Sequence, residues 1–160
     1  MIKIKELFQQ DFLQCYKLLD YRSGDLDYFR ELGWSQKEFN LQFSKKISFS
    51  LGLFDENKLE GFVIGNLITI EKKTEYEILL LYVNNKKRNL GYATTLLANI
   101  LSKLKKKKLI RIYLEVAENN TSAINLYYKN AFKKIGVRKN YYKFINNKKD
   151  AIILEKIINE

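Results

Sequence analysis

A short basic loop followed by a glycine is the first segment of this chain whose residue types suggest chemistry. Arg88 precedes Gly91 by three positions, and an amphipathic pattern begins directly after the glycine. The first turn of a helix has unpaired N–H groups and a positive dipole end, which together favour a bound anion. Gly91 allows the backbone to approach a ligand closely, and a guanidinium such as that of Arg88 can pair with phosphate oxygens. The segment therefore predicts a phosphate site, although a helix that merely starts at a glycine fits the pattern equally well.

The residues that the chain lacks narrow the chemistry further. Its 160 residues include no histidine and a single cysteine, Cys15, which excludes histidine-based triads, the usual zinc sites and an internal disulfide. Carboxylates, tyrosines, lysines and backbone groups remain. The loop is neither a P-loop, which ends in Gly-Lys-Ser/Thr, nor a dinucleotide fingerprint, which needs three spaced glycines. We expect Cys15, which lies in an apolar helical pattern, to be a buried structural thiol.

The spacing of apolar residues predicts the elements that would hold this loop. Alternating or continuous apolar runs predict strands, and offsets of three and four predict helices. The expected strands cover residues 2–6, 47–55, 59–70, 76–83, 109–116, 133–142 and 150–157, and the expected helices cover 10–20, a segment opened by 35–38, 91–104 and 121–130. Ser35 and Glu38 fit a capping box, with Trp34 as the staple residue before it.

This order of elements indicates an α/β (α+β) fold in a single domain over residues 1–160. The strands on either side of the turn at 57–58 form an antiparallel hairpin. The segments 76–116 and 109–142 each read as strand, helix, strand, and we expect locally parallel pairing in both. A mixed sheet with helices on its faces follows.

Two motifs resemble those of the GNAT acyltransferases. Arg88, Gly91 and Ala93 form an R-x-x-G-x-A pattern after an apolar strand, which resembles the family's acetyl-CoA pyrophosphate loop. The segment 114–132 resembles the later motif N-x-x-A-x-x-L-Y-x-x-x-G-F, and the matching residues are Asn120, Ala123, Leu126, Tyr127 and Phe132. Ala131 stands where the family usually has a glycine that serves a helix end, so we expect a cost of about 1 kcal/mol there.

A third block narrows the resemblance to the RimI type, the ribosomal-protein N-terminal-alanine acetyltransferases. It consists of "LEV…N…A…LYY", then residues 137–142 and 150–154; the resemblance covers roughly 60–157, and the first 55 residues match only loosely. The resemblance implies a GNAT fold: a mixed, mostly antiparallel central sheet of six to seven strands with about four helices on its faces. It also implies direct transfer of acetyl from acetyl-CoA to the N-terminal α-amine of a ribosomal protein, without a metal. The alternative is another GNAT enzyme that acetylates a protein lysine or a small amine.

The resemblance assigns catalytic roles to two residues. Glu115 would be the general base, and Glu77 is its rival because other GNAT enzymes use an acid at that strand. Tyr127 would be the general acid that protonates the departing thiolate of CoA. Only its spacing from Asn120 distinguishes Tyr127 from Tyr128, and a helical tyrosine at either position is also compatible with a purely structural role.

The resemblance also implies where the donor and acceptor bind. The cofactor-binding residues would be Leu81, Tyr82, Val83, Arg88, Asn89, Leu90, Gly91, Tyr92, Ala93, Thr94 and Asn120. The first three would offer backbone hydrogen bonds to the pantetheine arm, and residues 88–94 would hold the pyrophosphate. Tyr141 and Tyr142 would line the peptide entrance, unless they are simply paired strand aromatics.

The net charge of +11 allows two interpretations. It describes either a solvated surface or a surface that attracts a polyanion, such as the ribosome that carries the acceptor. A basic RNA-binding module is the rival from another class, but the eleven tyrosines and ten phenylalanines do not interleave with lysine in an RNA-binding motif. We therefore expect no specific nucleic-acid binding. With no signal peptide and no apolar run near ~20 residues, we expect a cytoplasmic protein, free of membranes and a monomer or weak dimer.

Overall fold

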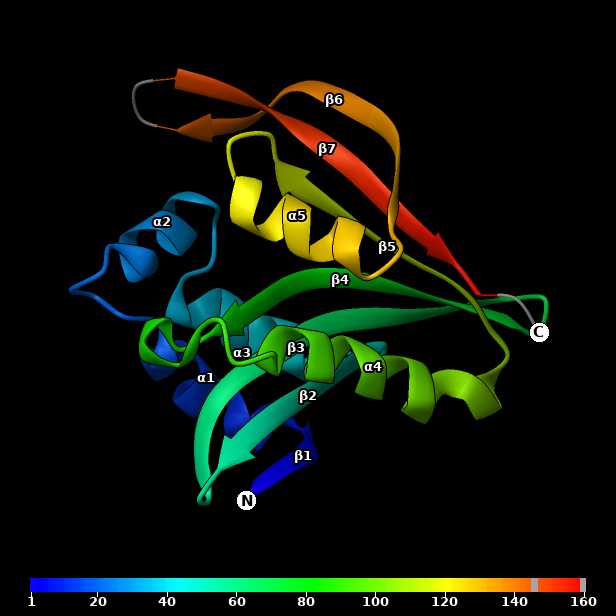
Figure 1. Cartoon of the computed structure of the whole chain (residues 1–160), viewed down its shortest axis with the longest axis horizontal. Helices are drawn as coiled ribbons and strands as arrows, with labels where there is room; N and C mark the ends of the chain where they lie inside the picture. The colour runs from blue at the N-terminus through cyan, green and yellow to red at the C-terminus, as the bar shows by residue number, and fades with distance from the viewer. Residues whose placement is uncertain (145–146, 159–160) are drawn as a thin grey trace.

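A computed structural model describes residues 1–144 and 147–158 as helices packed on one seven-stranded sheet (Figure 1). The strands follow the spatial order β1-β2-β3-β4-β5-β7-β6. Their bounds are β1 (Ile2–Leu7), β2 (Ser48–Asp55), β3 (Lys58–Ile70), β4 (Lys73–Val83), β5 (Leu109–Ala117), β6 (Lys133–Phe144) and β7 (Asn147–Ile157). The α-helices are α1 (Phe12–Leu18), α2 (Asp25–Glu31), α3 (Gln36–Ser44), α4 (Tyr92–Leu104) and α5 (Thr121–Lys129).

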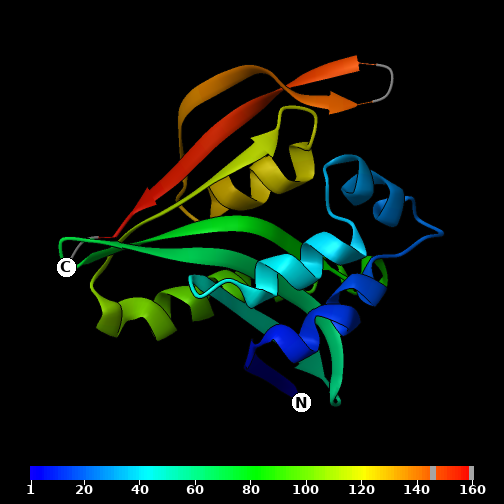
Figure 2. The ribbon, with the colours of Figure 1, turned by 180° about the vertical axis from the view of Figure 1, so that it is seen from behind.

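Helices cover both faces of the sheet, so the structure has two separate apolar cores. Figure 1 looks onto the face that carries α4 and α5, and Figure 2 looks onto the face that carries α1 and α3. The first core joins α4 and α5 to the strands, for example through Leu96, Ile100 and Tyr127. The second joins α1 and α3 to the strands, and it includes Cys15 and Phe39, both fully buried. The expected structural role of Cys15 is therefore confirmed.

The mixed α/β sheet expected from the sequence is confirmed, and the helix starts match closely. Ser35 caps α3 by accepting a hydrogen bond of 3.2 Å from the N–H of Glu38. Trp34, directly before the cap, packs edge-to-face on Phe39 with ring centroids 5.4 Å apart, which is the staple contact. The turn between β2 and β3 falls one residue earlier than expected, because Glu56 and Asn57 hold its positive φ angles of 48° and 66°.

Two expectations about the architecture were incomplete or wrong. The helix α2 was not expected, and it raises the number of α-helices in the described residues to five. The parallel pairing expected within 109–142 does not occur, because β7 lies between β5 and β6 and pairs antiparallel with both. The parallel pairing within 76–116 is confirmed for β4 and β5. The chain thus returns from the edge strand β6 through a hairpin and places its last strand between β5 and β6.

β4 and β5 separate halfway along their length, and this separation positions the candidate site. Their parallel pairing runs from Thr74 with Leu109 to Ile78 with Leu114, and the later residues of the two strands are not paired with each other. Figure 1 shows the two strands together near the C-terminus and diverging toward α2. A β-bulge lies at the point of divergence: Gly65 of β3 pairs with Ile78 and Ile64 pairs with Leu80, so Leu79 is the extra residue.

Candidate active site

The separated ends of β4 and β5 form the sides of a cleft of about 780 Å³. Backbone edges that face a cleft carry unpaired N–H and C=O groups, which an extended ligand can use as it would use a neighbouring strand. Three other segments complete the cleft: α2 with the loop to Trp34, α5 with its N-cap, and the second half of β6. The residues are Tyr28, Phe29, Glu31, Leu32, Trp34, Glu77, Ile78, Leu79, Leu80, Leu81, Tyr113, Leu114, Glu115, Val116, Ala117, Asn120, Ala123, Tyr127, Arg138, Tyr141, Tyr142 and Lys143.

Both carboxylates considered as bases, Glu115 and Glu77, line this cleft. The side chain of Glu115 is 25% exposed, and its Oε1 lies 3.0 Å from Nε of Arg138. Its neighbours Leu114 and Val116 are buried in the α4–α5 core, so Glu115 faces the opposite side of the sheet, as the alternation predicted. Glu77 pairs in register with Tyr113, and burial together with the carboxylate of Glu77 raises the pKa of Tyr113 to about 12. Glu77 therefore lies where β4 and β5 are still paired, whereas Glu115 lies beyond their last paired residues.

Tyr127 lines the cleft from α5, on the side of the sheet opposite Glu115. Only 5% of its surface is exposed, and its ring meets that of Phe132 edge-to-face at 5.2 Å. Burial raises the pKa of the Tyr127 phenol above its ordinary value of 10.0. Tyr128, the alternative that spacing alone left open, is 47% exposed and is absent from the cleft lining.

The loop from Arg88 to Thr94 has the backbone geometry of an anion site, at the end of β4 beyond the residues that line the cleft. Asn89 and Gly91 both have positive φ angles, 64° and 83°, and Gly91 is the N-cap of α4. The first helical hydrogen bond runs from the N–H of Thr95 to the carbonyl of Gly91. The N–H groups of the preceding turn have no partner within the helix, and no atom lies within 4 Å of the position where a Cβ on Gly91 would stand. Space and donors for a phosphate group are therefore both present.

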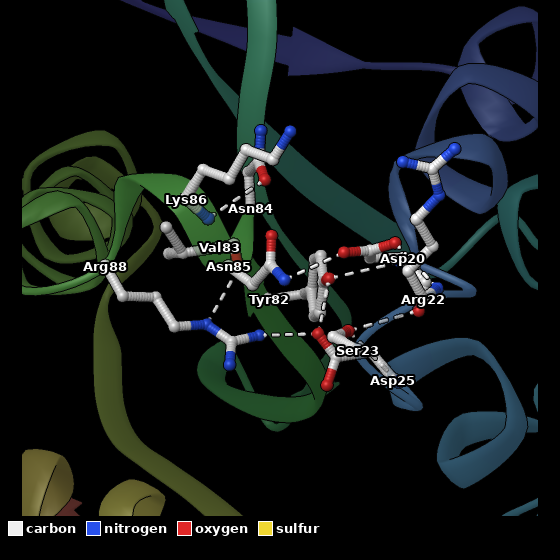
Figure 3. A network of polar contacts seen from close by, with 10 residues as sticks. All are labelled: Asp20, Arg22, Ser23, Asp25, Tyr82, Val83, Asn84, Asn85, Lys86 and Arg88. Atoms are coloured by element: carbon white, nitrogen blue, oxygen red, sulfur yellow. Dashed lines mark hydrogen bonds and ion pairs between the residues drawn. The ribbon is translucent and has the colours of Figure 1, made fainter.

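The side chain of Arg88 contacts α2 and the end of β4 (Figure 3). Its Nε donates to the carbonyl of Val83 at 3.1 Å, and its Nη2 lies 2.9 Å from Oδ2 of Asp25. The hydroxyl of Tyr82 donates to the same Asp25 oxygen at 2.7 Å, and the Arg88 guanidinium lies over the Tyr82 ring at 5.4 Å. Asp25 thus connects α2 to both the end of β4 and the basic loop.

Of the remaining residues expected to bind the cofactor, some line the cleft and others do not. Leu81 and Asn120 line the cleft, whereas Tyr82 and Val83 lie beyond its lining. Asn120 is the N-cap of α5, and its Oδ1 accepts a hydrogen bond of 3.2 Å from the N–H of Ala123. Its Nδ2 is the donor end of the side chain, and it lies beside Tyr28, whose pKa is raised by burial and lowered by a hydrogen bond from the Asn120 side chain.

Aromatic side chains from α2 and β6 meet across the mouth of the cleft. Tyr141 and Tyr142 both line it, and their rings lie 5.1 Å apart. Tyr28 of α2 stacks on Phe144 of β6 at 5.9 Å, a contact that the sequence analysis missed because it did not predict α2. Figures 1 and 2 both show the β6–β7 hairpin reaching over toward α2.

Within residues 1–144 and 147–158, no cluster of three or more histidine, cysteine, aspartate or glutamate side chains is arranged to bind a metal ion. Over the same residues, no helix has the length and apolar character needed to span a bilayer.

Several known proteins resemble this chain in sequence or in fold. A family model described as Acetyltransferase (GNAT) family matches residues 3–132. The chain is 29% identical over 122 residues to the ribosomal protein bS18-alanine N-acetyltransferase of Escherichia coli strain K12, which covers 76% of this chain and 78% of the relative. The crystal structure of the ribosomal-protein-S18-alanine N-acetyltransferase from Escherichia coli superposes with a TM-score of 0.81 at 24% identity, over 100% of this chain and 96% of that one. The structure of Arabidopsis thaliana NAA60 in complex with acetyl-CoA superposes with a TM-score of 0.79 at 18% identity, over 100% of both chains.

Proposed function

The chain belongs to the GNAT family of acetyltransferases, and from that premise we propose that it transfers acetyl from acetyl-CoA to the N-terminal alanine α-amine of a ribosomal protein. The acetyl-CoA-dependent N-acetyltransferase chemistry follows from the family and from relatives named for it. The observation that carries the finer proposal is the placement of Glu115 and Tyr127 in one cleft, between strands that separate. The name of the Escherichia coli relative supports the ribosomal-protein acceptor.

The residues of the basic loop fit the diphosphate of acetyl-CoA. The N–H groups of Tyr92, Ala93 and Thr94 point out of the amino end of α4, where the helix dipole favours negative charge. Asn89 and Leu90 precede this helix start in the loop, and Arg88, directly before them, adds a positive charge. When bound, acetyl-CoA supplies the acetyl group as a thioester.

The end of β4 fits the extended arm of the same molecule. Beyond Ile78 this strand is no longer paired with β5, so backbone groups of Leu81 to Val83 on that edge can bond an amide-containing chain, beside the carbonyl of Val83 that already accepts a hydrogen bond from Arg88. Asn120 faces the same cleft from α5 and offers its Nδ2 to the arm. These contacts direct the reactive end toward the middle of the cleft, where Glu115 and Tyr127 lie.

Glu115 is proposed as the base that takes a proton from the acceptor amine, directly or through a water molecule. An α-amine with a reference pKa near 8 loses its proton at pH 7 for about 1.4 kcal/mol, against about 4.6 kcal/mol for a lysine. A carboxylate therefore suffices for a chain terminus, and no histidine is needed. Glu115 is favoured over Glu77 because it lies where β4 and β5 have already separated, so an acceptor has room beside it.

Tyr127 is proposed as the acid at the other side of the reaction. As the bond from nitrogen to the acetyl carbon forms and the carbon–sulfur bond breaks, the phenol donates its hydrogen to the sulfur. The raised pKa of Tyr127 keeps the phenol protonated at neutral pH, which is the form that can donate. A thiol of reference pKa near 8.5 leaves without much help, so the contribution of Tyr127 is moderate.

Tyr141 and Tyr142 are proposed to line the acceptor's path at the mouth of the cleft. Both side chains line the cleft together with Glu115, and burial and then the charge of Glu115 raise the pKa of Tyr142. An acceptor that passes these rings reaches Glu115 next. We treat the whole chain, residues 1–160, as one catalytic domain.

Acetyl transfer to defined peptides tests the proposed function. One peptide begins with Ala-Arg and lacks lysine, and the second has a blocked amino end and one internal lysine. The proposal predicts CoA release and acetylation at the α-amine of the first peptide, with much slower transfer to the second. Preferred acetylation of the lysine, or of a small amine, would favour the alternative acceptors and rule out the proposed one.

A further inference from the structure

Glu115 is not alone in the cleft, because Arg138 reaches it from a strand that is not its neighbour. β7 lies between β5, which carries Glu115, and β6, which carries Arg138. The Arg138 side chain nevertheless brings Nε to 3.0 Å from the Glu115 carboxylate. The Arg138 side chain is 56% exposed and that of Glu115 is 25% exposed, so the guanidinium is the more solvent-accessible partner of this pair.

A bulge in β6 fixes the backbone beside Arg138. Arg138 pairs with Ala151 and Tyr142 pairs with Lys149, so three residues of β6 stand opposite the single residue Asp150. Asn140 in this bulge has a φ of 51°, and its N–H donates to Oδ1 of Asp150 at 2.8 Å. Asp150 therefore anchors the segment from which Arg138 projects.

A second contact fixes the direction of the guanidinium itself. It lies over the ring of Tyr141, with its central carbon 5.3 Å from the ring centroid. A cation over an aromatic face is stabilised and has fewer orientations open to it. Arg138 and Tyr141 both line the cleft, so this stacked pair forms part of its wall beside Glu115.

We propose that Arg138 is a specificity-determining residue, which selects α-amines over lysine ε-amines by donating a hydrogen bond to the first peptide carbonyl of the acceptor. The inference rests on the proposed function, in which the acceptor nitrogen lies beside Glu115. In a chain terminus, the first carbonyl carbon is two bonds from that nitrogen. In a lysine side chain the same place is taken by methylene groups, which accept no hydrogen bond.

The chemistry of the guanidinium suits this role. It carries five N–H donors in a fixed plane, and the ion pair to Glu115 through Nε uses one of them. The others remain for a carbonyl oxygen close to the carboxylate. A lysine at position 138 would keep the charge but not the planar fork, so it would replace only part of the function.

The test compares the two peptides described above, with steady-state kinetics for the full chain and for Arg138→Gln. We expect the KM for the α-amine peptide to rise about tenfold, the usual effect of losing one hydrogen bond from a charged donor, with kcat changed less than about twofold. The lysine peptide should react as before, so the preference for the α-amine falls about tenfold. Arg138→Lys should recover part of the lost preference.

Lys134→Gln is the matched control, because it removes one positive charge from the same strand at an exposed position outside the cleft lining. It should leave the preference unchanged. The inference is overturned if Arg138→Gln keeps the wild-type preference, or if it lowers kcat equally on both peptides, which would mean that Arg138 only holds Glu115 in place. A wild-type chain that acetylates neither peptide overturns the proposed function and this inference with it, whereas wild-type α-amine activity with an unchanged preference in the variant overturns the inference alone.

Discussion

Asp25 of α2 and Arg88 of the basic loop are 63 positions apart in the chain, and their side chains form an ion pair of 2.9 Å. The pair joins the segment on the acceptor side of the cleft to the loop proposed to hold the diphosphate. Arg88 is 45% exposed and Asp25 is 21% exposed. A phosphate that binds Arg88 must therefore share it with, or take it from, a carboxylate.

Replacing Asp25 tests which role Arg88 has. An ion pair of this exposure is worth up to about 1 kcal/mol, so Asp25→Asn should lower the KM for acetyl-CoA by as much as about fivefold. Arg88→Gln should raise it about tenfold, because a charge-assisted bond to phosphate is lost. The KM for acetyl-CoA at saturating peptide is the measurement. An increase of similar size in both variants would show that Arg88 braces the loop and does not bind the phosphate.

Replacing Tyr127 tests the proposed acid. Tyr127→Phe should lower kcat about ten- to a hundredfold without abolishing turnover, at the low end of what a general acid usually contributes. Tyr128→Phe, next to it on an exposed side of α5, is the control and should keep the wild-type rate. An unchanged kcat for Tyr127→Phe would remove this residue from the mechanism.

The same residue gives a prediction about pH. The donating form of Tyr127 is the protonated one, which is populated below its pKa, and burial raises that pKa above 10.0. The phenol therefore stays protonated through the range from about pH 6 to 9, and loss of its proton should not reduce kcat there. Profiles of kcat against pH for the wild type and Tyr127→Phe should have the same shape. An alkaline decline that disappears in the variant would contradict the assignment.

Gly65 is required by the bulge that opens the cleft. A Cβ at this position would lie 2.4 Å from the carbonyl oxygen of Glu77 and from Cζ of Tyr76, and backbone cannot move aside cheaply. Gly65→Ala should lower the free energy of unfolding by about 1–3 kcal/mol. Gly136→Ala is the control, because its Cβ would meet only Ile153 at 3.4 Å. Urea unfolding of both variants measures the difference, and equal stability of the two would show that the bulge tolerates a side chain.

The backbone of Ala131 is strained, as expected for an alanine where the family usually has a glycine. Its φ is 68°, in the left-handed region that favours glycine, at the end of α5. Ala131→Gly should therefore raise the free energy of unfolding by about 1 kcal/mol. The same substitution at exposed Ala98, inside α4, should lower it by about as much. A destabilised Ala131→Gly in urea unfolding would mean that neighbouring contacts, and not the backbone angle, decide the stability there.

Local sequence patterns predicted most of the helices and strands. The features that they did not predict depend on contacts between residues far apart in the chain. Strands such as β2 and β4 and helices such as α4 follow from period alone, and Ser35 capped α3 where its motif indicated. α2 has only seven residues and starts at Gly24 without a side-chain cap, so it has neither a long apolar stripe nor a start signal. The insertion of β7 beside β5 depends on a β6–β7 hairpin that pairs with distant strands, which no local pattern encodes.

In the candidate site, too, motif spacing predicted some residues, and others depend on long-range contacts. Glu115, Tyr127 and Asn120 come from consecutive elements, and their motif spacing brought them to one cleft as expected. Arg138 and Tyr28 were missed because their roles depend on the β6 bulge opposite Asp150 and on α2 facing the β6–β7 hairpin. The ion pair between Arg88 and Asp25 could not be predicted from a sequence motif either, since 63 positions separate the two residues.

The proposed base is the centre of this account, and two isosteric variants test it most directly. The measurement is the initial rate of acetyl transfer from acetyl-CoA to the Ala-Arg peptide, with Glu115→Gln and Glu77→Gln compared to the wild type. We predict that Glu115→Gln lowers kcat at least about a hundredfold, while Glu77→Gln stays within about threefold of the wild type. Wild-type turnover in Glu115→Gln, or a loss of activity in Glu77→Gln alone, would contradict the account.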